Sequence, residues 1–244
     1  MKSAIIETLQ KTINLYKFSF KVCFVFSLSL SILIESFKIC ALKIGLYGAL
    51  GRYFEYGSIP DSFESNNLLA FLGLFSIFTT IGIHGLSIYL CEMQYGNKTS
   101  HLTMSQIRKS LNIFKGRFWC FFSVFFINIV LSGVAGFLGV VGLWLINSFS
   151  FIVFPLILLA DIGVFQAYQR SFVIMGKNIT YALQIGFVMV LLLGIKHFIY
   201  FVFNNTHFGL ERTVVVFTEA LLLPFVTTLM IIVYHHLLPL SGDN

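Results

Sequence analysis

Charged residues are scarce in this sequence: Asp, Glu, Lys and Arg make up only 11% of its 244 residues. Soluble domains carry about 25% charged and about 45 to 50% apolar residues, so a soluble globular fold is excluded. Hydrophobic residues reach 57%, and the mean hydropathy is +0.89. No polar stretch approaches the size of a soluble catalytic domain, which is about 50 residues or more. The composition therefore predicts a single polytopic membrane domain over residues 1–244.

Motifs for catalysis or metal binding are also lacking. The sequence has no H-E-x-x-H, no G-x-S-x-G and no phosphate-binding loop. His235 and His236 are adjacent and would point about 100° apart on a helix, which does not suit one shared metal ion. The four cysteines have no C-x-x-C spacing and fall within or at the edges of predicted spans, which favours buried thiols: Cys23, Cys40, Cys91 and Cys120. We therefore expect no enzyme activity, no cofactor and no metal.

The net charge of +6 does not indicate nucleic-acid binding. The basic residues sit beside apolar runs, where contact with anionic lipid headgroups is the ordinary interpretation. Membrane lipids are thus the expected partners. Contacts with other membrane proteins and the oligomeric state are left open.

Apolar runs long enough to cross a hydrocarbon core, about 20 residues each, recur along the chain. They predict an all-α membrane protein with six transmembrane helices. The predicted spans cover about 21–41, 67–91, 118–143, 145–160, 181–203 and 213–237. Residues 47–66 contain glycine, proline and an acidic group, which predicts an outer loop between the first two spans.

Residues 1–17 predict an amphipathic helix that lies on the membrane surface. Its apolar residues recur at helical spacing, with polar residues on the other side: Ile5, Ile6, Leu9, Ile13 and Tyr16. The alternative is a plain cytosolic tail, which would leave this apolar stripe in water.

The distribution of basic residues predicts the orientation. With the amino terminus inside, eleven Lys and Arg residues fall on the inner side and five on the outer side. Inner connections carry the excess of basic residues, so both termini are predicted to be cytoplasmic.

Ionisable residues inside predicted spans are candidate functional residues, because a charge in hydrocarbon costs at least about 2.5 kcal/mol. They are Glu35, Lys38, His84, Lys196, His197 and Glu219. Glu35 and Lys38, three residues apart, predict a mutual ion pair. Glu219 precedes Pro224 by just over one helical turn, which fits either a proton or cation pathway or a neutral, hydrogen-bonded carboxyl. His84 fits either a structural hydrogen bond across helices or a ligand-binding role.

Span three contains four glycines at a spacing of three: Gly133, Gly136, Gly139 and Gly142. A step of three falls about 60° short of a full turn, so the pattern predicts a smooth groove that winds around one helix. Close helix packing is its expected use, with a substrate pathway as the alternative.

The segment after Pro155 has the most local structure. Asp161 is predicted as the N-cap of a helix of roughly fourteen residues that Gly176 ends in a left-handed conformation before Asn178. A ridge of small residues is predicted along this helix: Gly163, Ala167 and Ser171. The pattern predicts a second interfacial helix docked on the bundle, and the alternative is a continuation of span four.

This segment carries a family resemblance. Its proline, its acidic residue, its Gly-Val-Phe at 163–165 and its Gly-Lys-Asn at 176–178 resemble the YciC-like family of uncharacterised bacterial inner-membrane proteins. Val233-Tyr234-His235 after Pro224 extends the match, while Ile-Pro-Gly, frequent in the family before span four, is absent here. The chain is also similar to the membrane region of some glycerophosphodiester phosphodiesterases. The resemblance implies six spans in a bacterial inner membrane. It carries over no catalytic residue, because those relatives hold their active site in a soluble domain.

Two classes of function remain open. The first is a non-enzymatic membrane protein that supports envelope or lipid homeostasis through helix packing and lipid contact. The second is a small transporter or channel that uses Glu219 and His84.

Overall fold

The computed structural model describes residues 4–43, 78, 81–82, 84–96, 103–203 and 208–238. These residues form helices and short connections, with no strand among them, as the predicted all-α class requires. The helices are α1 (Ala4–Lys43), a segment at 84–96, α4 (Met104–Gly136), α5 (Gly139–Ser150), α6 (Val153–Leu159), α7 (Val164–Lys177), α8 (Ile179–Phe203) and α9 (Phe208–Leu237). The predicted loop at 47–66 and the start of the second span lie outside the described residues.

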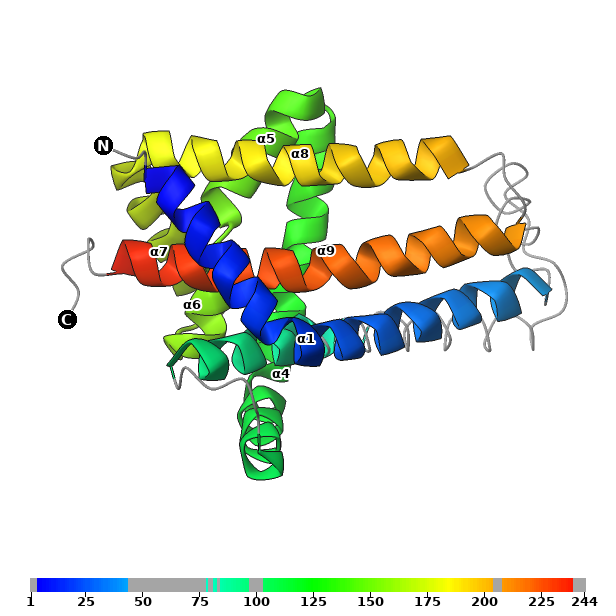
Figure 1. Ribbon diagram of the computed structural model, residues 1–244. Helices are drawn as coiled ribbons and strands as arrows, with labels where there is room; N and C mark the ends of the chain where they lie inside the picture. The colour runs from blue at the N-terminus through cyan, green and yellow to red at the C-terminus, as the bar shows by residue number, and fades with distance from the viewer. Residues whose placement is uncertain are drawn as a thin grey trace, which may run out of the picture.

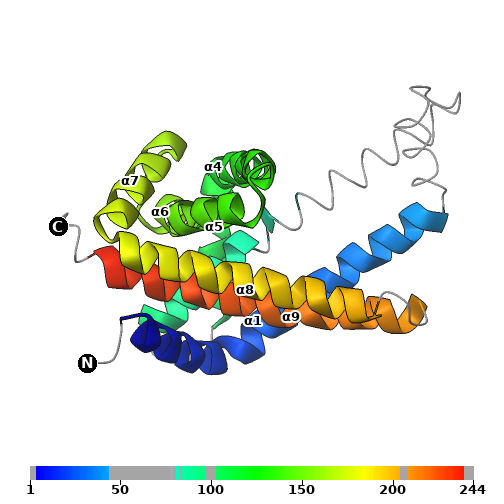
Figure 2. The same cartoon turned by 90° about the horizontal axis from the view of Figure 1, so that it is seen from above.

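Four stretches within the described part of the chain are long and apolar enough to cross a membrane: Met104–Gly136, Gly139–Leu159, Ile179–Phe203 and Val216–Leu237. They correspond to the last four predicted spans and support an integral membrane protein. Figures 1 and 2 show α8 and α9 side by side, with α4 running across them and both termini at one end of the molecule. The crossing of a bilayer by six helices stays a prediction.

The boundary between spans three and four was predicted wrongly. α4 ends at Gly136, not at 143, and α5 begins at Gly139 after a tight turn. Gly139 has a φ of +64°, a left-handed conformation that glycine adopts without steric cost. The four glycines therefore belong to two helices and form no winding groove. A Cβ on Gly142 would overlap the carbonyl oxygen of Ala135, so this glycine lets α5 pack closely on α4.

The predicted interfacial helix at 1–17 and the predicted first span are parts of one continuous helix, α1, which changes direction in its first half (Figures 1 and 2). α1 packs along α9. Among the α1 side chains that the structure describes, the buried ones are Leu15 and five with hydroxyl groups, namely Thr8, Thr12, Ser19, Ser27 and Ser31. Small hydroxyl residues let two helices approach closely without a hydrophobic driving force.

The apolar stripe predicted at the start of α1 is divided between two environments. Ile5 and Leu9 pack against the core, whereas Ile6 and Ile13 are 46% and 43% exposed. Tyr16 lies edge-on against Phe225 of α9, with ring centroids 5.7 Å apart. The helix therefore buries threonines against the protein and turns part of its apolar stripe outward.

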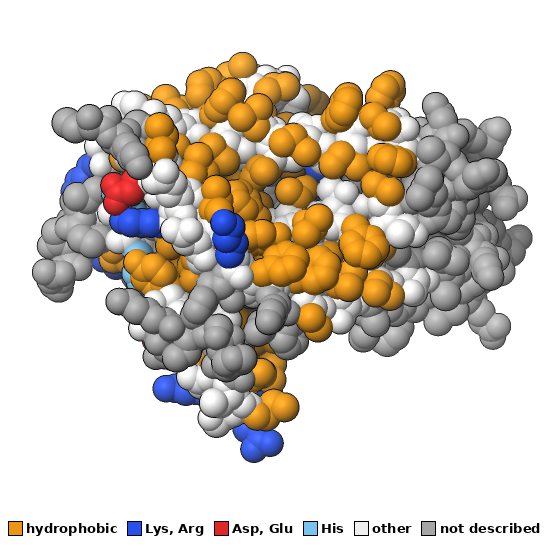
Figure 3. All heavy atoms as spheres, in the orientation of Figure 1, with side chains coloured by type: hydrophobic (Ala, Val, Ile, Leu, Met, Phe, Trp, Pro, Cys, Tyr) orange, Lys and Arg blue, Asp and Glu red, His pale blue; other side chains and the backbone are white. Residues whose placement is uncertain are grey.

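The core lies where α6, α7, α8 and α9 meet α4 and the 84–96 segment. Its fully buried side chains include Phe121, Leu156, Ile157, Met175, Ile185 and Ile231. Large apolar side chains also cover the exterior, as Figure 3 shows for one face. An apolar exterior over membrane-length helices is suited to contact with lipid chains.

Candidate functional site

Two of the predicted intramembrane charges form an ion pair between neighbouring helices. Lys196 Nζ of α8 donates to Glu219 Oε1 of α9 at 3.0 Å, and about a quarter to a third of each side chain is exposed (30% and 26%). The sequence identified both residues as candidates but did not pair them. α9 stays helical through Pro224, whose carbonyl oxygen accepts a hydrogen bond from Thr228 Oγ1 at 2.7 Å. Glu35 and Lys38 were the other predicted ion pair, and the structure does not describe their side chains.

His84 lies among aromatic rings. Its ring centroid is 6.0 Å from that of Phe121 and 5.6 Å from that of Phe154. Its Nδ1 atom is buried and has no hydrogen-bond partner among the described residues. His84 and Glu219 therefore lie in different environments, one aromatic and the other ionic.

A polar cluster that no sequence pattern indicated lies at the end of the molecule where both termini are found. His235 Nε2 lies within hydrogen-bond distance of both carboxyl oxygens of Glu92, at 3.0 Å from Oε1 and 2.7 Å from Oε2. Tyr95 stacks on His235 with ring centroids 4.6 Å apart. Glu92 and Tyr95 are three residues apart, a spacing that places them on one helix face. Their partner on α9 lies 143 residues away from Glu92, too far in sequence for any local pattern to reveal.

The same end of the molecule ties α1 to α8. Thr8 Oγ1 lies 2.8 Å from the Tyr181 hydroxyl, and the Tyr181 ring contacts that of His236 at 5.1 Å. On the exposed side, Lys11 Nζ lies 2.7 Å from Glu7. The hydrogen bond and charge of Lys11 hold the pKa of the Glu7 carboxyl below its ordinary value. The described residues contain no group of three or more His, Cys, Asp or Glu that could hold a metal.

The start and end of the predicted second interfacial helix were placed wrongly. α7 runs from Val164 to Lys177, and its N-cap is Gly163 instead of Asp161. Asp161 has a φ of 59° and pairs with Arg117 of α4, so its carboxylate is not directed at the helix N-terminus. Gly176 is a helical residue of α7 and not its left-handed end. Asn178 is the C-cap, and its side-chain amide donates to the Ile174 carbonyl at 3.0 Å.

α7 packs against α5 and α6, and two of its small residues are buried. Ala167 and Ser171 are completely buried, and Ser171 Oγ donates to the Phe149 carbonyl at 2.6 Å. Gly163, the third predicted member of this ridge, is exposed. Pro155 is buried in the first turn of α6, where proline is tolerated because that N–H has no intrahelical partner.

Tyr168 adds a polar link from α7 to α4. Its hydroxyl donates to the Val124 carbonyl at 3.3 Å, and burial raises its pKa to about 12. The hydroxyl therefore keeps its proton, and with it the hydrogen bond, throughout the physiological pH range. α7 is held by packing and by hydrogen bonds to two neighbouring helices.

We expect Ala167→Leu to lower the free energy of unfolding by about 1 to 3 kcal/mol, because a larger side chain at a fully buried position forces strain on its neighbours. Thermal unfolding in detergent would measure the change. Gln169→Leu, at an exposed position of the same helix, is the matched control and should leave the stability almost unchanged. Equal stability of Ala167→Leu and the parent would contradict the close docking of α7.

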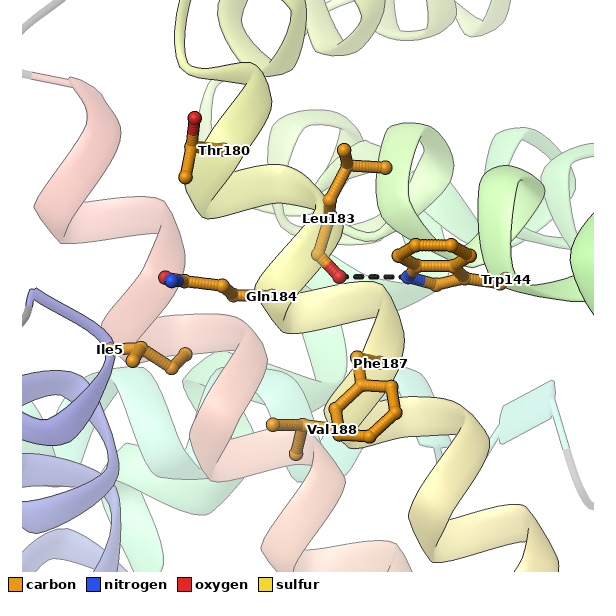
Figure 4. A pocket seen from close by; sticks show the side chains of 7 residues that line it. All are labelled: Ile5, Trp144, Thr180, Leu183, Gln184, Phe187 and Val188. Atoms are coloured by element: carbon orange, nitrogen blue, oxygen red, sulfur yellow. Dashed lines mark hydrogen bonds between the residues drawn. The ribbon is translucent and has the colours of Figure 1, made fainter.

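A groove of about 420 Å³ lies on α8 next to the start of α1 and to α5. It is lined by Ile5, Trp144, Thr180, Leu183, Gln184, Phe187 and Val188 (Figure 4). We call this the α8 groove. The Trp144 indole N–H donates to the Leu183 carbonyl at 2.8 Å, and this hydrogen bond fixes the indole ring at the edge of the α8 groove. Apart from Thr180 and Gln184, the lining side chains present only apolar or aromatic surface. Neither Glu219 nor His84 lines it.

Comparisons with protein-family models, with curated proteins and with solved structures find no match. Membership of the YciC-like family stays a prediction from the sequence features described above.

Proposed function

We propose that this chain is a non-enzymatic bacterial inner-membrane protein of the YciC-like family that supports envelope or lipid homeostasis by direct contact with lipid. The observation that carries the proposal is the α8 groove, which we assign to one phospholipid acyl chain. The membrane-length apolar helices support the setting in a bilayer.

The chemistry of the α8 groove favours an acyl chain over a polar solute. Its walls are mainly apolar, and the two polar side chains, Thr180 and Gln184, lie at positions four apart on α8. Beyond the groove the apolar surface continues along the same helix, since Phe187, Leu191 and Ile195 recur every four residues and are 49 to 54% exposed. An acyl chain in the groove would therefore remain in contact with apolar side chains along α8, and its polar end could reach Thr180 or Gln184.

The transport alternative receives less support. A carboxylate that carries protons or cations must be reached by them, whereas Glu219 is engaged with Lys196. His84 is surrounded by Phe121 and Phe154. These contacts favour structural roles for both residues.

The orientation proposed with this function places both termini in the cytoplasm. Reporter fusions after Gly96 and after Lys177 should then report the cytoplasm, and fusions within 56–66 the outside, because the basic residues cluster on the inner side. The reverse pattern would contradict the orientation without bearing on the α8 groove.

Trp144 provides a direct test of the α8 groove. The chain has two tryptophans, so Trp119→Phe leaves Trp144 as the single fluorophore at the groove edge. In nanodiscs containing lipids brominated on the acyl chains, we expect strong quenching of Trp144. Gln184→Phe, which fills the groove with an aromatic ring, should reduce the quenching.

Leu193→Phe is the matched control, because it adds the same ring to a different face of α8. It should leave the quenching unchanged. Weak quenching in the parent, or equal quenching in all three proteins, would reject an acyl chain in the groove.

A further inference from the structure

The first part of α4 has an unusual charge distribution. Residues 93–160 contain no Asp or Glu, yet five Lys and Arg residues lie between 98 and 117. Arg117 is paired with Asp161 from beyond this stretch. Arg108, Lys109 and Lys115 are exposed on α4, so this region presents a net positive charge.

A second groove, the α4 groove, lies on this basic segment. It has a volume of about 490 Å³ and is lined by Met104, Ser105, Arg108, Lys109, Asn112 and Ile113. Two cationic side chains therefore share one hollow with a hydroxyl and an amide, all groups that donate hydrogen bonds to phosphate oxygens. The capping box of Thr103 and Gln106 fixes the helix start beside it.

Apolar side chains accompany these cations on the exposed surface. Met104 is 77% exposed and Trp119 is 68% exposed, and Leu111 and Ile113 are also exposed. Figure 3 shows Lys and Arg beside apolar side chains at the bottom of the view, where α4 begins in Figure 1. Helices that combine basic residues with exposed apolar and tryptophan side chains bind at the boundary between lipid headgroups and acyl chains.

We propose that the α4 groove binds the headgroup of an anionic phospholipid. Arg108 and Lys109 contact the phosphate, while Ser105 and Asn112 donate hydrogen bonds to the headgroup. Met104, Ile113 and Trp119 contact the upper acyl chains. The site rests on the proposed lipid contact but is separate from the α8 groove, since the two share no lining residue.

The test uses the full chain with Trp144→Phe, so that Trp119 is the single fluorophore. The protein in detergent is titrated with dihexanoyl phosphatidylglycerol, with dihexanoyl phosphatidylcholine and with inorganic phosphate. We expect saturable binding of phosphatidylglycerol that shifts Trp119 emission to shorter wavelength and weakens at high salt. Phosphatidylcholine should bind far more weakly, and phosphate should produce no comparable shift.

Replacing Arg108 and Lys109 together by glutamine should raise the Kd for phosphatidylglycerol about 30-fold, since each cation near an anionic lipid surface contributes a factor of about five. Lys17→Gln with Lys177→Gln removes the same charge from exposed positions elsewhere and should leave the Kd unchanged. The salt dependence of phosphatidylglycerol binding is measured on the protein with Arg108 and Lys109 intact, so this part of the test does not depend on the folding of the double variant.

Three outcomes would overturn the inference. Equal binding of the two lipids would exclude a headgroup site for anions. Binding of phosphate as tight as that of phosphatidylglycerol would assign the groove to a free anion. Equal weakening in both double variants would show a general effect of charge. Because the α8 groove is tested by Trp144 and brominated acyl chains, failure of either site leaves the other result intact.

Discussion

Lys196→Met is expected to lower the free energy of unfolding by about 3 to 5 kcal/mol, because it leaves the Glu219 carboxylate without this cation between two membrane-length helices. Unfolding by denaturant in detergent micelles would measure the loss. The effect is large because a carboxylate that loses a counterion in a low-dielectric setting is costly, whereas a counterion 3.0 Å away offsets much of that cost.

The double variant Lys196→Met with Glu219→Met distinguishes an ion pair from two separate functional charges. Replacing both partners of a buried pair by apolar residues is often neutral or stabilising. Since this pair is largely shielded, with 30% and 26% of the two side chains exposed, the second substitution should restore most of the stability lost by the first. A double variant less stable than Lys196→Met would contradict a coupled structural pair and would return Glu219 to consideration as part of a transport pathway.

Gly186→Leu should destabilise the protein by about 3 kcal/mol or more, at the upper end of overpacking effects. A Cβ at this position would overlap the Ser148 hydroxyl and would lie 2.8 Å from the Trp144 carbonyl oxygen. Both neighbours belong to α5, so a larger side chain must push α5 and α8 apart. Thermal unfolding in detergent would measure the loss of stability.

Gly194→Leu on the same helix is the control, because a Cβ there would meet no atom within 4 Å. It should be neutral or slightly stabilising, since leucine favours a helix more than glycine does. Equal effects of the two substitutions would show that the close packing of α5 and α8 is wrong. Gly186→Leu should also reduce Trp144 quenching by brominated lipids, because Trp144 would be displaced from the α8 groove.

The apolar runs and the low charge were sufficient to predict helices of membrane length over most of α4, α8 and α9. The hydropathy of a segment indicates whether it can lie in the hydrocarbon core of a membrane, and the length of the apolar run determines whether a helix can cross that core. The turn at Gly139 was misplaced by several residues, because four glycines at equal spacing do not reveal which of them adopts a positive φ.

The buried face of α1 could not be predicted from the periodicity of apolar residues. The sequence contains Thr8, Thr12, Ser19, Ser27 and Ser31 at helical spacing, and these residues proved to be buried. A search for small hydroxyl residues, not only for apolar ones, would have found this face. In a membrane, no hydrophobic driving force directs apolar side chains toward the protein interior, because lipid chains are as apolar as the interior.

Contacts between distant segments required the tertiary structure. Lys196 and Glu219 could be recognised as costly charges, but their pairing depends on how α8 lies against α9. Glu92 and His235 interact although 143 residues separate them in the sequence. Asp161, predicted as a helix cap, instead pairs with Arg117. The sequence by itself determined the membrane class, the helical content and the charges that need partners, because these follow from composition and local periodicity. Only the tertiary structure determined which charged side chains pair with each other, because the pairing depends on which helix surfaces are in contact.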